Sequence, residues 1–512
     1  MLLKTYGSAV YGISAQLITI EVDVGQGAKT QIIGLPDNAV KESQPRVNSA
    51  MKNSGFTYPR KGVVINMAPA DIKKEGSAYD LPIAIGVMAA GELIVTDLLN
   101  ETIIMGELSL DGSLLPIKGA LPIAIQAQKD GFKKLILPSA NAREAAIVKD
   151  LDVYGLEHLK EVVEFLQGER EYKPVVVDPR NEFADNIDKL IYDFSDVKGQ
   201  ENIKRAMEIA AAGGHNIILI GPPGAGKTML AKRLNTILPP MNLHEALETT
   251  KIHSVAGRLG SNASLMAQRP FRSPHHTISD VALVGGGNNP QPGEISLAHN
   301  GVLFLDELPE FKRTVLEVLR QPLEDRKVTI SRAKFSVDYP SSMMLVASMN
   351  PCPCGYFNHP EKECVCAPGV VQKYLSKISG PLLDRIDIHI EVTPVKFEEL
   401  NETIKDEEKS SAIRNRVIQA RELQQKRFEK IPIYNNAQME SNLIRQYCEI
   451  NPAGALLLKN AMNKLNLSAR AYDRILKVSR TIADLSGNDH ILMEHLAEAI
   501  HYRSLDRENW GV

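Results

Sequence analysis

The 512-residue chain is too long for one compact core, and with 44% hydrophobic and 24% charged residues it predicts about two to four folded domains rather than disorder. The formal net charge of −3 excludes a global basic field for nucleic acid, so any contact with DNA must be local. The longest apolar run, residues 81–95, is interrupted by proline and glutamate and is shorter than the roughly 20 apolar residues of a spanning helix. Since the start shows no signal-peptide pattern, we expect a soluble cytoplasmic protein with no membrane partner.

Four segments follow one another along the chain. Residues 1–172 alternate short β-like runs such as VVINMAP and KKLILP with amphipathic stretches, which indicates an α/β domain. Residues 173–193 carry prolines and charges without a helical period and are predicted to be a linker. In residues 194–395 the runs NIILIG, VLFLDE and MMLVASMN alternate with helical stretches, which predicts a parallel sheet of βαβ units. Residues 396–512 have the pattern of amphipathic helices and are predicted to be a helical lid.

The strongest motif is GPPGAGKT, which directly follows the apolar NIILI and precedes the helical MLAKRLNTIL. In this strand, loop and helix context the pattern predicts a phosphate-binding loop. Its glycines let backbone amides close around phosphates, and the helix N-terminus adds the positive end of its dipole. We expect Lys227 to reach the β- and γ-phosphates of ATP and Thr228 to ligate Mg²⁺. The loop consists of Gly221, Pro222, Pro223, Gly224, Ala225, Gly226, Lys227 and Thr228.

Two further strand ends carry polar residues. VLFLDE ends in Asp306 and Glu307, which suits a Walker B element whose aspartate orients the Mg²⁺ hydration shell and whose glutamate activates water, although such a pair can also be a helix N-cap. MMLVASMN ends in Asn350. The three strand ends together resemble the AAA+ ATPases. The resemblance implies that Asn350 is sensor 1, that Arg385 in LLDRIDI is an arginine finger acting on a neighbouring subunit, and that Arg470 is sensor 2. A structural salt bridge is the alternative for each arginine.

About 77 residues separate Thr228 from Asp306, more than one helix and one strand need. The turn-rich RPFRSPHHTISD and VGGGNNPQPGEIS look like an insertion, and RKVTISRAKFSVDY predicts a hairpin because its period-two alternation breaks near residues 332–334. These features resemble the helix-2 insert and pre-sensor-1 hairpin of the magnesium-chelatase and MCM branch, whose loops face the pore of a ring in motor members. Solvated turns are the alternative. The resulting candidates for contact with DNA phosphates are Arg269, Arg272, His275, His276, Arg332 and Lys334.

The first domain contains IIGLPDNAVKESQPRV and IMGELSLDGSLLPIKGALPIAIQ, which look like the proteolytic domain of Lon proteases, a fold shared with one domain of ribosomal protein S5. Lon cleaves with a serine and lysine pair. The resemblance puts Ala78 at the serine position and Leu121 at the lysine position, with Ser77 one place away. We therefore expect a Lon-like domain without protease activity, since both nucleophile and base are missing.

Four of the five cysteines fall in NPCPCGYFNHPEKECVC, where Cys352 and Cys354 form one pair and Cys364 and Cys366 another. In a reducing compartment such a cluster is more typical of metal ligands or free thiols than of disulfides. Four thiolates from two tight turns can close a tetrahedral Zn²⁺ site, and a site with no open position is structural rather than catalytic. Reduced or redox-active thiols are the alternatives, and His359 could replace one ligand.

The Lon-like, magnesium-chelatase-like and helical parts together cover nearly the whole chain. Through GLPDNAVKES, RPFRSPHHT and NPCPCG they resemble the ComM (YifB) family of magnesium-chelatase-like AAA+ proteins. The resemblance implies a hexameric, ATP-driven ring motor on single-stranded or branched DNA, with helicase or branch-migration activity in recombination or natural transformation. One alternative is a chelatase-type chaperone that inserts a metal or remodels a partner protein. Another is a non-motor switch whose protease-like domain binds peptides.

Overall fold

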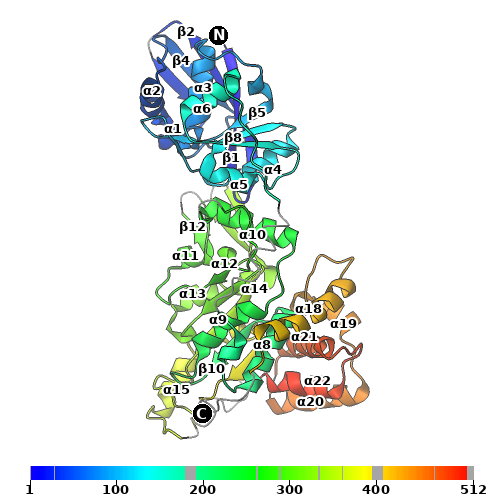
Figure 1. The fold of residues 1–512 in the computed structure, drawn as a ribbon. Helices are drawn as coiled ribbons and strands as arrows, with labels where there is room; N and C mark the ends of the chain where they lie inside the picture. Colours follow the sequence, from blue (N-terminus) through cyan, green and yellow to red (C-terminus); the bar gives the residue numbers. More distant parts are fainter. Residues whose placement is uncertain are drawn as a thin grey trace.

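The computed structural model shows an N-terminal α/β domain at one end, a central α/β domain, and a helical lid against one side of the central domain (Figure 1). This order agrees with the fold class expected from the sequence. Most of the predicted linker, together with the two ends of the predicted lid, lies outside the described residues. In the part of the chain that is described, no helix is both long and apolar enough to cross a membrane. The described residues are 2–27, 29–178, 192–260, 263–287, 290–332, 335–359, 361–394, 407–465 and 467–503.

A seven-stranded mixed sheet forms the N-terminal domain, in the order β3–β4–β2–β1–β5–β8–β9. Its longest strands, β1 (Leu2–Tyr11) and β2 (Ser14–Gly25), form an antiparallel hairpin. Alternate residues of β2, among them Ile18 and Ile20, are buried, as the period of two requires. The remaining strands are β3 (Thr30–Ile33), β4 (Gly62–Ala68), β5 (Thr102–Ile104), β8 (Lys134–Pro138) and β9 (Asp152–Leu156), with the small ribbon β6 (Glu107–Leu108) and β7 (Leu114–Leu115).

Helix α3 (Asp80–Ala90) is the central helix of this domain, and every residue in it is buried. Gly86 allows the helix to lie close to β2, since a Cβ there would come within 2.7 Å of the Cγ2 of Val22. At the start of α3, the carboxylate of Asp80 pairs with Arg46 at 2.8 Å. The other helices are α1 (Asn38–Lys41), α2 (Ser43–Asn53), α4 (Ala120–Lys129), α5 (Ser139–Ala145) and α6 (Leu159–Gln167).

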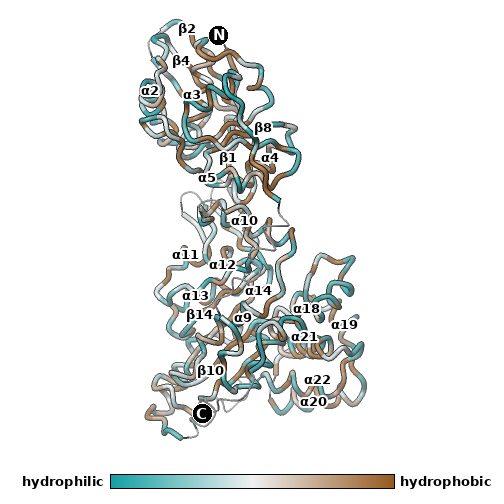
Figure 2. The backbone as a smooth tube through the Cα atoms, viewed as in Figure 1, coloured by the Kyte–Doolittle hydropathy of each residue, from teal (hydrophilic) through white to brown (hydrophobic). Residues whose placement is uncertain are grey.

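The central domain is built on a five-stranded sheet in the order β11–β14–β17–β10–β18, in which every pair is parallel. All residues of β10, β14 and β17 are buried because helices cover both faces of the sheet. Figure 2 shows the corresponding hydrophobic colour along β10. The strands are β11 (Phe271–Arg272), β14 (Val302–Leu305), β17 (Met344–Met349), β10 (Ile217–Ile220) and β18 (Ile388–Glu391). The predicted parallel sheet is thereby confirmed.

The insertion links the central domain to the N-terminal domain. Helix α10 (Leu243–Ala256) begins with a capping box formed by Asn242 and Glu245. It packs against α4, and the Gly119 N–H donates to the Ser254 carbonyl at 3.2 Å. The rest of the insertion is short and turn-rich, as expected, with α11 (Asp280–Val284), the ribbon β12 (Gly285–Gly286) and β13 (Gln291–Pro292), and α12 (Glu294–Leu297).

The predicted hairpin is present as β15 (Lys327–Arg332) paired with β16 (Phe335–Pro340). Its base is anchored in the apolar core through Val328, Ile330, Val337 and Tyr339. The structure does not describe Lys334, which lies between the two strands in the sequence, or the side chain of Arg332, the last residue of β15. The hairpin therefore joins a fixed base to a tip whose sequence is basic.

The lid packs against the central domain through α18 (Ser410–Arg427) and α21 (Ala469–Leu485), which contact α8 (Glu201–Gly213). Helix α21 is buried over most of its second half because it lies between other helices. An ion pair between Arg427 and Asp484, 2.5 Å long, ties the two lid helices together. The remaining lid helices are α19 (Ser441–Tyr447), α20 (Pro452–Leu465) and α22 (Met493–His501).

Candidate nucleotide site

Residues 221–228 form the loop between strand β10 and helix α9 (Lys227–Ile237), the position expected of a phosphate-binding loop. Gly224 and Gly226 have φ angles of 81° and 85°, a left-handed conformation that glycine adopts without strain. The first amides of α9 have no acceptor within the helix, so they remain available to an anion.

Lys227 is the first residue of helix α9, and its side chain reaches back to the start of this loop. Its ammonium donates to the carbonyls of Gly221 at 2.7 Å and Pro222 at 2.9 Å, and to Oδ1 of Asn350 at 3.0 Å. Burial lowers the pKa of Lys227, while the nearby charges of Asp306 and Glu307 act in the opposite direction. The structure thus brings together the loop lysine and the predicted sensor-1 asparagine from two neighbouring strand ends.

Asp306 joins three strand ends. The Thr228 hydroxyl donates to its Oδ2 at 2.7 Å, and the hydroxyl of buried Ser348 donates to its Oδ1. A hydroxyl and a carboxylate side by side offer the hard oxygen ligands that Mg²⁺ takes beside a nucleotide, so the residues fit the expected metal. Sequence reasoning missed Ser348, which stands two residues before Asn350 and so on the same side of strand β17.

Glu307 has a left-handed backbone, with φ at 53°, and its side chain is 55% exposed. Nδ1 of His276 lies 3.6 Å from its Oε2. His276 also lies against the ring of His275, with centroids 4.0 Å apart, and meets Phe311 edge-on. The insertion residue that we expected at DNA phosphates is therefore beside the predicted water-activating carboxylate.

Arg385 and Arg470 lie at the opposite end of the sheet from the loop. Arg385 comes three residues before β18, whose first residue pairs with the first residue of β10, so at least the length of a four-residue strand, about 13 Å, separates it from Gly221. Its side chain is 4% exposed and contacts Glu324 at 2.6 Å. Arg470 is exposed in the first turn of α21. Against the effect of burial, Arg385 and then Arg470 lower the pKa of Glu324, which places both arginines near it.

The two arginines of the insertion that we expected at DNA phosphates are held in ion pairs. Arg269 contacts the Glu245 carboxylate at 3.0 Å and donates to backbone carbonyls, and Arg272 contacts Glu294 at 2.6 Å. Both are turned toward the protein rather than open to a polyanion. The structure therefore offers no support for their predicted DNA contacts, whereas His275 is exposed.

The four clustered cysteines converge. All four sulfurs lie within 4.8 Å of one another, and the Sγ of Cys364 lies 3.7 Å from that of Cys352 and 3.6 Å from that of Cys354. Ligands in a tetrahedral Zn–S₄ site are about 3.8 Å apart when each Zn–S bond is about 2.3 Å. The donor set thus fits zinc. His359 is outside the cluster, since its Nδ1 accepts two backbone N–H groups.

The cysteine loop packs against the phosphate-binding loop. Gly355, with φ at 88°, lies so close to Pro223 that a Cβ would come within 2.4 Å of the proline ring. Phe357 and Asn358 line one cavity together with Gly221. A change in the cysteine loop can therefore reach the nucleotide site by direct contact.

In the N-terminal domain, Leu121 is fully buried and its N–H donates to the Glu144 carboxylate at 2.8 Å. Ala78 lies in the short 3₁₀ turn Ser77–Tyr79 and is partly buried. Within the described residues, no hydrogen bond joins the Ser77 hydroxyl to a lysine or histidine side chain. That this domain has no protease activity stays a prediction.

A parallel sheet with a phosphate-binding loop after one strand, an acidic pair after a second, an asparagine after a third and a helical lid defines an AAA+ protein. The description "Magnesium chelatase, subunit ChlI" fits residues 193–400, "Subunit ChlI of Mg-chelatase" fits residues 20–141, and the ChlI C-terminal description fits residues 407–503. This family implies ATP and Mg²⁺ as ligands.

The competence protein ComM of Haemophilus influenzae is 46% identical over 504 residues, covering 98% of this chain and 97% of its own. The YifB protein of Escherichia coli is 44% identical over 501 residues, which cover 98% of this chain and 96% of the YifB chain. Lon protease 2 of Bacillus subtilis is 32% identical over 153 residues, 28% of this chain and 27% of its own. The chain belongs to the ComM and YifB family of magnesium-chelatase-like AAA+ proteins, which confirms the resemblance seen in its sequence and the Lon-like part of the fold.

Proposed function

We propose that the protein is an ATP-driven ring motor acting on DNA, in helicase or branch-migration steps of recombination or natural transformation. The observation that supports assembly into a ring is the separation of Arg385 and Arg470 from the phosphate-binding loop of their own chain. A head-to-tail neighbour would place one end of the sheet against the other, and repetition of that contact closes a ring. We propose a hexamer. Similarity to a competence protein over the full length supports DNA as the substrate.

Each residue of the site has a separate role in ATP hydrolysis. When bound, ATP and its Mg²⁺ supply a phosphoanhydride and a metal that neutralises its charge. Lys227 places positive charge at the phosphates, and Thr228 and Asp306 orient the metal's ligands. The exposed carboxylate of Glu307 takes a proton from water, and the Asn350 amide orients that water. Arg385 and Arg470 of a neighbouring copy add positive charge where it develops.

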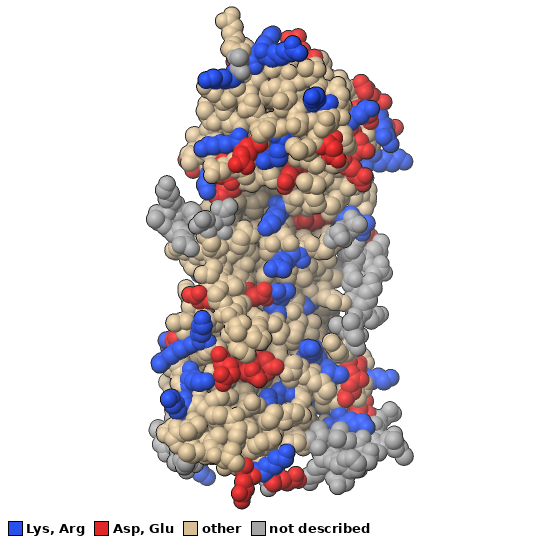
Figure 3. Space-filling model, turned by 90° about the vertical axis from the view of Figure 1, so that its left-hand side faces the viewer, with Lys and Arg blue, Asp and Glu red and all other residues tan. Residues whose placement is uncertain are grey.

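DNA contact is assigned to the hairpin tip. The face drawn in Figure 3 shows basic and acidic side chains interspersed, without a broad basic area. Because the net charge is −3, a motor on a polyanion needs a local contact. Arg332 ends strand β15 of a hairpin with an anchored base, and Lys334 follows it two residues later in the sequence. Backbone contacts of this kind carry no base-sequence preference.

Replacing both Arg332 and Lys334 with alanine should abolish stimulation of ATPase by DNA while basal ATPase survives, because neither residue belongs to the phosphate-binding loop or to the acidic and asparagine strand ends. The salt dependence of DNA binding should fall by about two units of slope, one for each lost phosphate contact. ATPase assays with and without forked DNA, and binding titrations against salt, measure both effects. Exposed Lys459 and Lys464 on α20, changed together, are the control with equal charge loss. Undiminished DNA stimulation in the hairpin variant would refute this assignment.

We also propose that Cys352, Cys354, Cys364 and Cys366 hold one structural zinc. The spacing of their sulfurs supports this, as does the Phe357 N–H, which donates to Cys352 Sγ at 3.3 Å in the manner of a tight turn around a thiolate.

Protein purified without added metal should contain one zinc per chain by elemental analysis. Cys364→Ser should lose the metal and loosen the loop, because metal binding and local folding are coupled. Since this loop contacts Pro223, basal ATPase should also fall several-fold. The control is Cys448→Ala, since Cys448 lies in the lid and outside the cluster. The protein with this change should retain its zinc. Full occupancy in Cys364→Ser, or metal-free wild-type protein, would count against the site.

A protein-remodelling or chelatase-type activity is the second candidate. The observation that favours it is the match of three segments to descriptions of a magnesium-chelatase subunit. Because the similarity to the competence protein ComM extends over 98% of this chain, the DNA motor remains our preferred proposal.

A further inference from the structure

A cavity of about 480 Å³, including the solvent space at its mouth, lies at the amino ends of the central strands, on the side of the sheet away from the phosphate-binding loop. Gly301 and Met344, which line it, stand at the start of β14 and β17. Helix α10 contributes Glu245, and the lid contributes Arg421 from α18. We call this cavity the arginine pocket.

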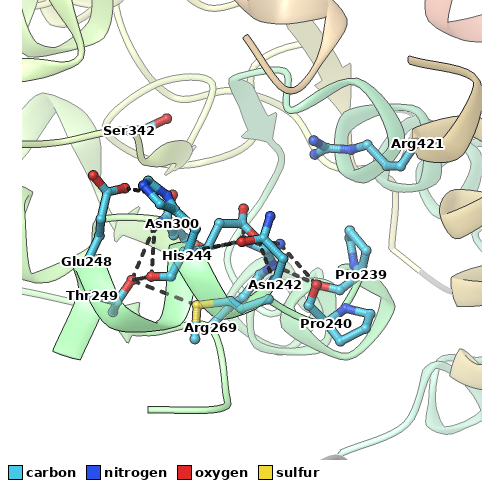
Figure 4. A network of polar contacts seen from close by, with 12 residues as sticks. Pro239, Pro240, Asn242, His244, Glu248, Thr249, Arg269, Asn300, Ser342 and Arg421 are labelled. Atoms are coloured by element: carbon cyan, nitrogen blue, oxygen red, sulfur yellow. Dashed lines mark hydrogen bonds and ion pairs between the residues drawn. The ribbon is translucent and has the colours of Figure 1, made fainter. Parts of the chain in front are cut away.

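The lining of the arginine pocket carries three guanidinium groups, from Arg269, Arg326 and Arg421, and one carboxylate, from Glu245. Arg269 is the one that the carboxylate neutralises, through bonds of 3.2 and 3.0 Å. Figure 4 shows Arg269 within a network of hydrogen bonds and ion pairs, and the side chain of Arg421 pointing toward that network from the lid. The charges of the other two arginines, Arg326 and Arg421, are not balanced by the carboxylate of Glu245.

Arg421 is held by the end of a helix of the central domain. Nε and Nη2 of Arg421 donate to the Ala211 carbonyl, at 3.3 and 3.0 Å, in the last turn of α8. A helix C-terminus supplies only about half a negative charge. For both arginines, no ion pair with a carboxylate occurs among the residues that the structure describes. The uncompensated charge at the pocket is then about +1.5.

Arg326 and Arg421 are partly exposed, and removing such charge even partly from water without a partner costs free energy. Burial and then the charge of Arg269 lower the pKa of Arg421 to about 9, and burial and then Arg474 lower that of Arg326 to about 10. Both directions mean that the surroundings disfavour the charged form. A guanidinium nevertheless keeps its proton in proteins, so an anion is the available compensation.

We propose that the arginine pocket binds a small phosphate-type oxyanion through Arg326 and Arg421. A phosphate carries about −1.5 to −2 charges near neutral pH, which matches the excess positive charge, and its oxygens accept the paired N–H groups that guanidinium presents. The hydroxyl of Ser342 and the amide of Gln438, both in the lining, add polar contacts that suit a tetrahedral anion.

The occupant would contact three separate parts of the chain. Arg326 directly precedes β15 of the hairpin, Arg421 belongs to the lid, and Arg269 belongs to the insertion. An anion held by these groups would stabilise the packing of lid, hairpin and insertion together. This inference does not rest on the proposed DNA function, and either can fail without the other.

The test uses the full-length protein with Lys227→Ala, which weakens binding at the phosphate-binding loop, and assigns to the pocket only the binding that depends on Arg326 and Arg421. Titration calorimetry with inorganic phosphate, pyrophosphate or ATP, at constant ionic strength set with chloride, should show saturable binding in the millimolar range or tighter. Adding Arg421→Gln should weaken binding at least tenfold, as should Arg326→Gln. Arg445→Gln, which removes an exposed charge elsewhere on the lid, should change nothing.

Saturation by inorganic phosphate would identify a free anion as sufficient, and saturation by ATP alone would identify the phosphates of a nucleotide. Absence of saturable binding by all three probes would overturn the proposal. So would equal affinity in the Arg421→Gln and Arg326→Gln proteins, since the arginines would then serve only the packing of the lid. If Arg421→Gln does not fold, Arg326→Gln and the titration of the protein with an intact pocket still decide the matter.

Discussion

Replacing Glu307 with glutamine should lower the rate of ATP hydrolysis by about a hundredfold or more while ATP still binds, because the change removes the proton acceptor and leaves the phosphate-binding loop intact. Lys227→Ala should instead weaken ATP binding by at least about tenfold, since an ammonium that bonds to phosphate contributes about 1.5 to 3 kcal/mol. Turnover assays with binding measured by a fluorescent ATP analogue separate the two effects.

Matched controls lie close by. Glu310→Gln changes an exposed carboxylate three residues further on, and Lys232→Ala changes an exposed lysine of the same helix α9. Both should keep normal binding and turnover. If Glu307→Gln lost ATP binding as severely as Lys227→Ala, the division between water activation and phosphate binding would be wrong.

Arg385→Ala should reduce ATPase by about a thousandfold if the arginine acts on a neighbour's nucleotide. Because it would act across the interface, mixing Arg385→Ala with Lys227→Ala subunits should restore activity. In an equal mixture about one interface in four joins an intact loop to an intact arginine, so recovery should approach a quarter of the wild-type rate. Steady-state ATPase across a series of mixing ratios measures this.

The ion pair with Glu324 allows a sharper control. Glu324→Gln removes the partner and keeps Arg385, so it isolates the structural contribution of the contact. A finger role predicts nearly normal ATPase in Glu324→Gln. Equal losses in the two variants, together with no recovery in rings shown to be mixed, would indicate that the contact with Glu324 is the whole role of Arg385.

Sequence alone was sufficient where chemistry follows a strand end. The apolar runs before Gly221, Asp306 and Asn350 predicted parallel strands, and in a parallel sheet their carboxyl ends meet at one edge. The structure brings Lys227 to Asn350 and Thr228 to Asp306 at that edge. The cysteine cluster was predictable for a similar reason, since short spacing and turn residues fix where the thiols can go.

Sequence was not sufficient where a side chain's role depends on distant partners. In the sequence, Arg269 and Arg272 look like free basic residues of a turn-rich segment. In the structure they form ion pairs with Glu245 and Glu294. His276 lies beside Glu307 because β11 pairs with β14, and no local sequence pattern predicts that pairing. The arginine pocket could not be foreseen either, because its lining comes from the insertion, the hairpin base and the lid.

The most direct test of the account is the ATPase rate of the assembled protein with and without four-way or forked DNA, beside parallel assays with a tetrapyrrole and with unfolded protein as competing substrates. The account predicts several-fold stimulation by branched DNA that weakens as salt rises, and no response to the tetrapyrrole. An assembled, ATP-hydrolysing protein that neither binds any DNA form nor changes its rate with DNA would contradict the motor proposal and favour protein remodelling.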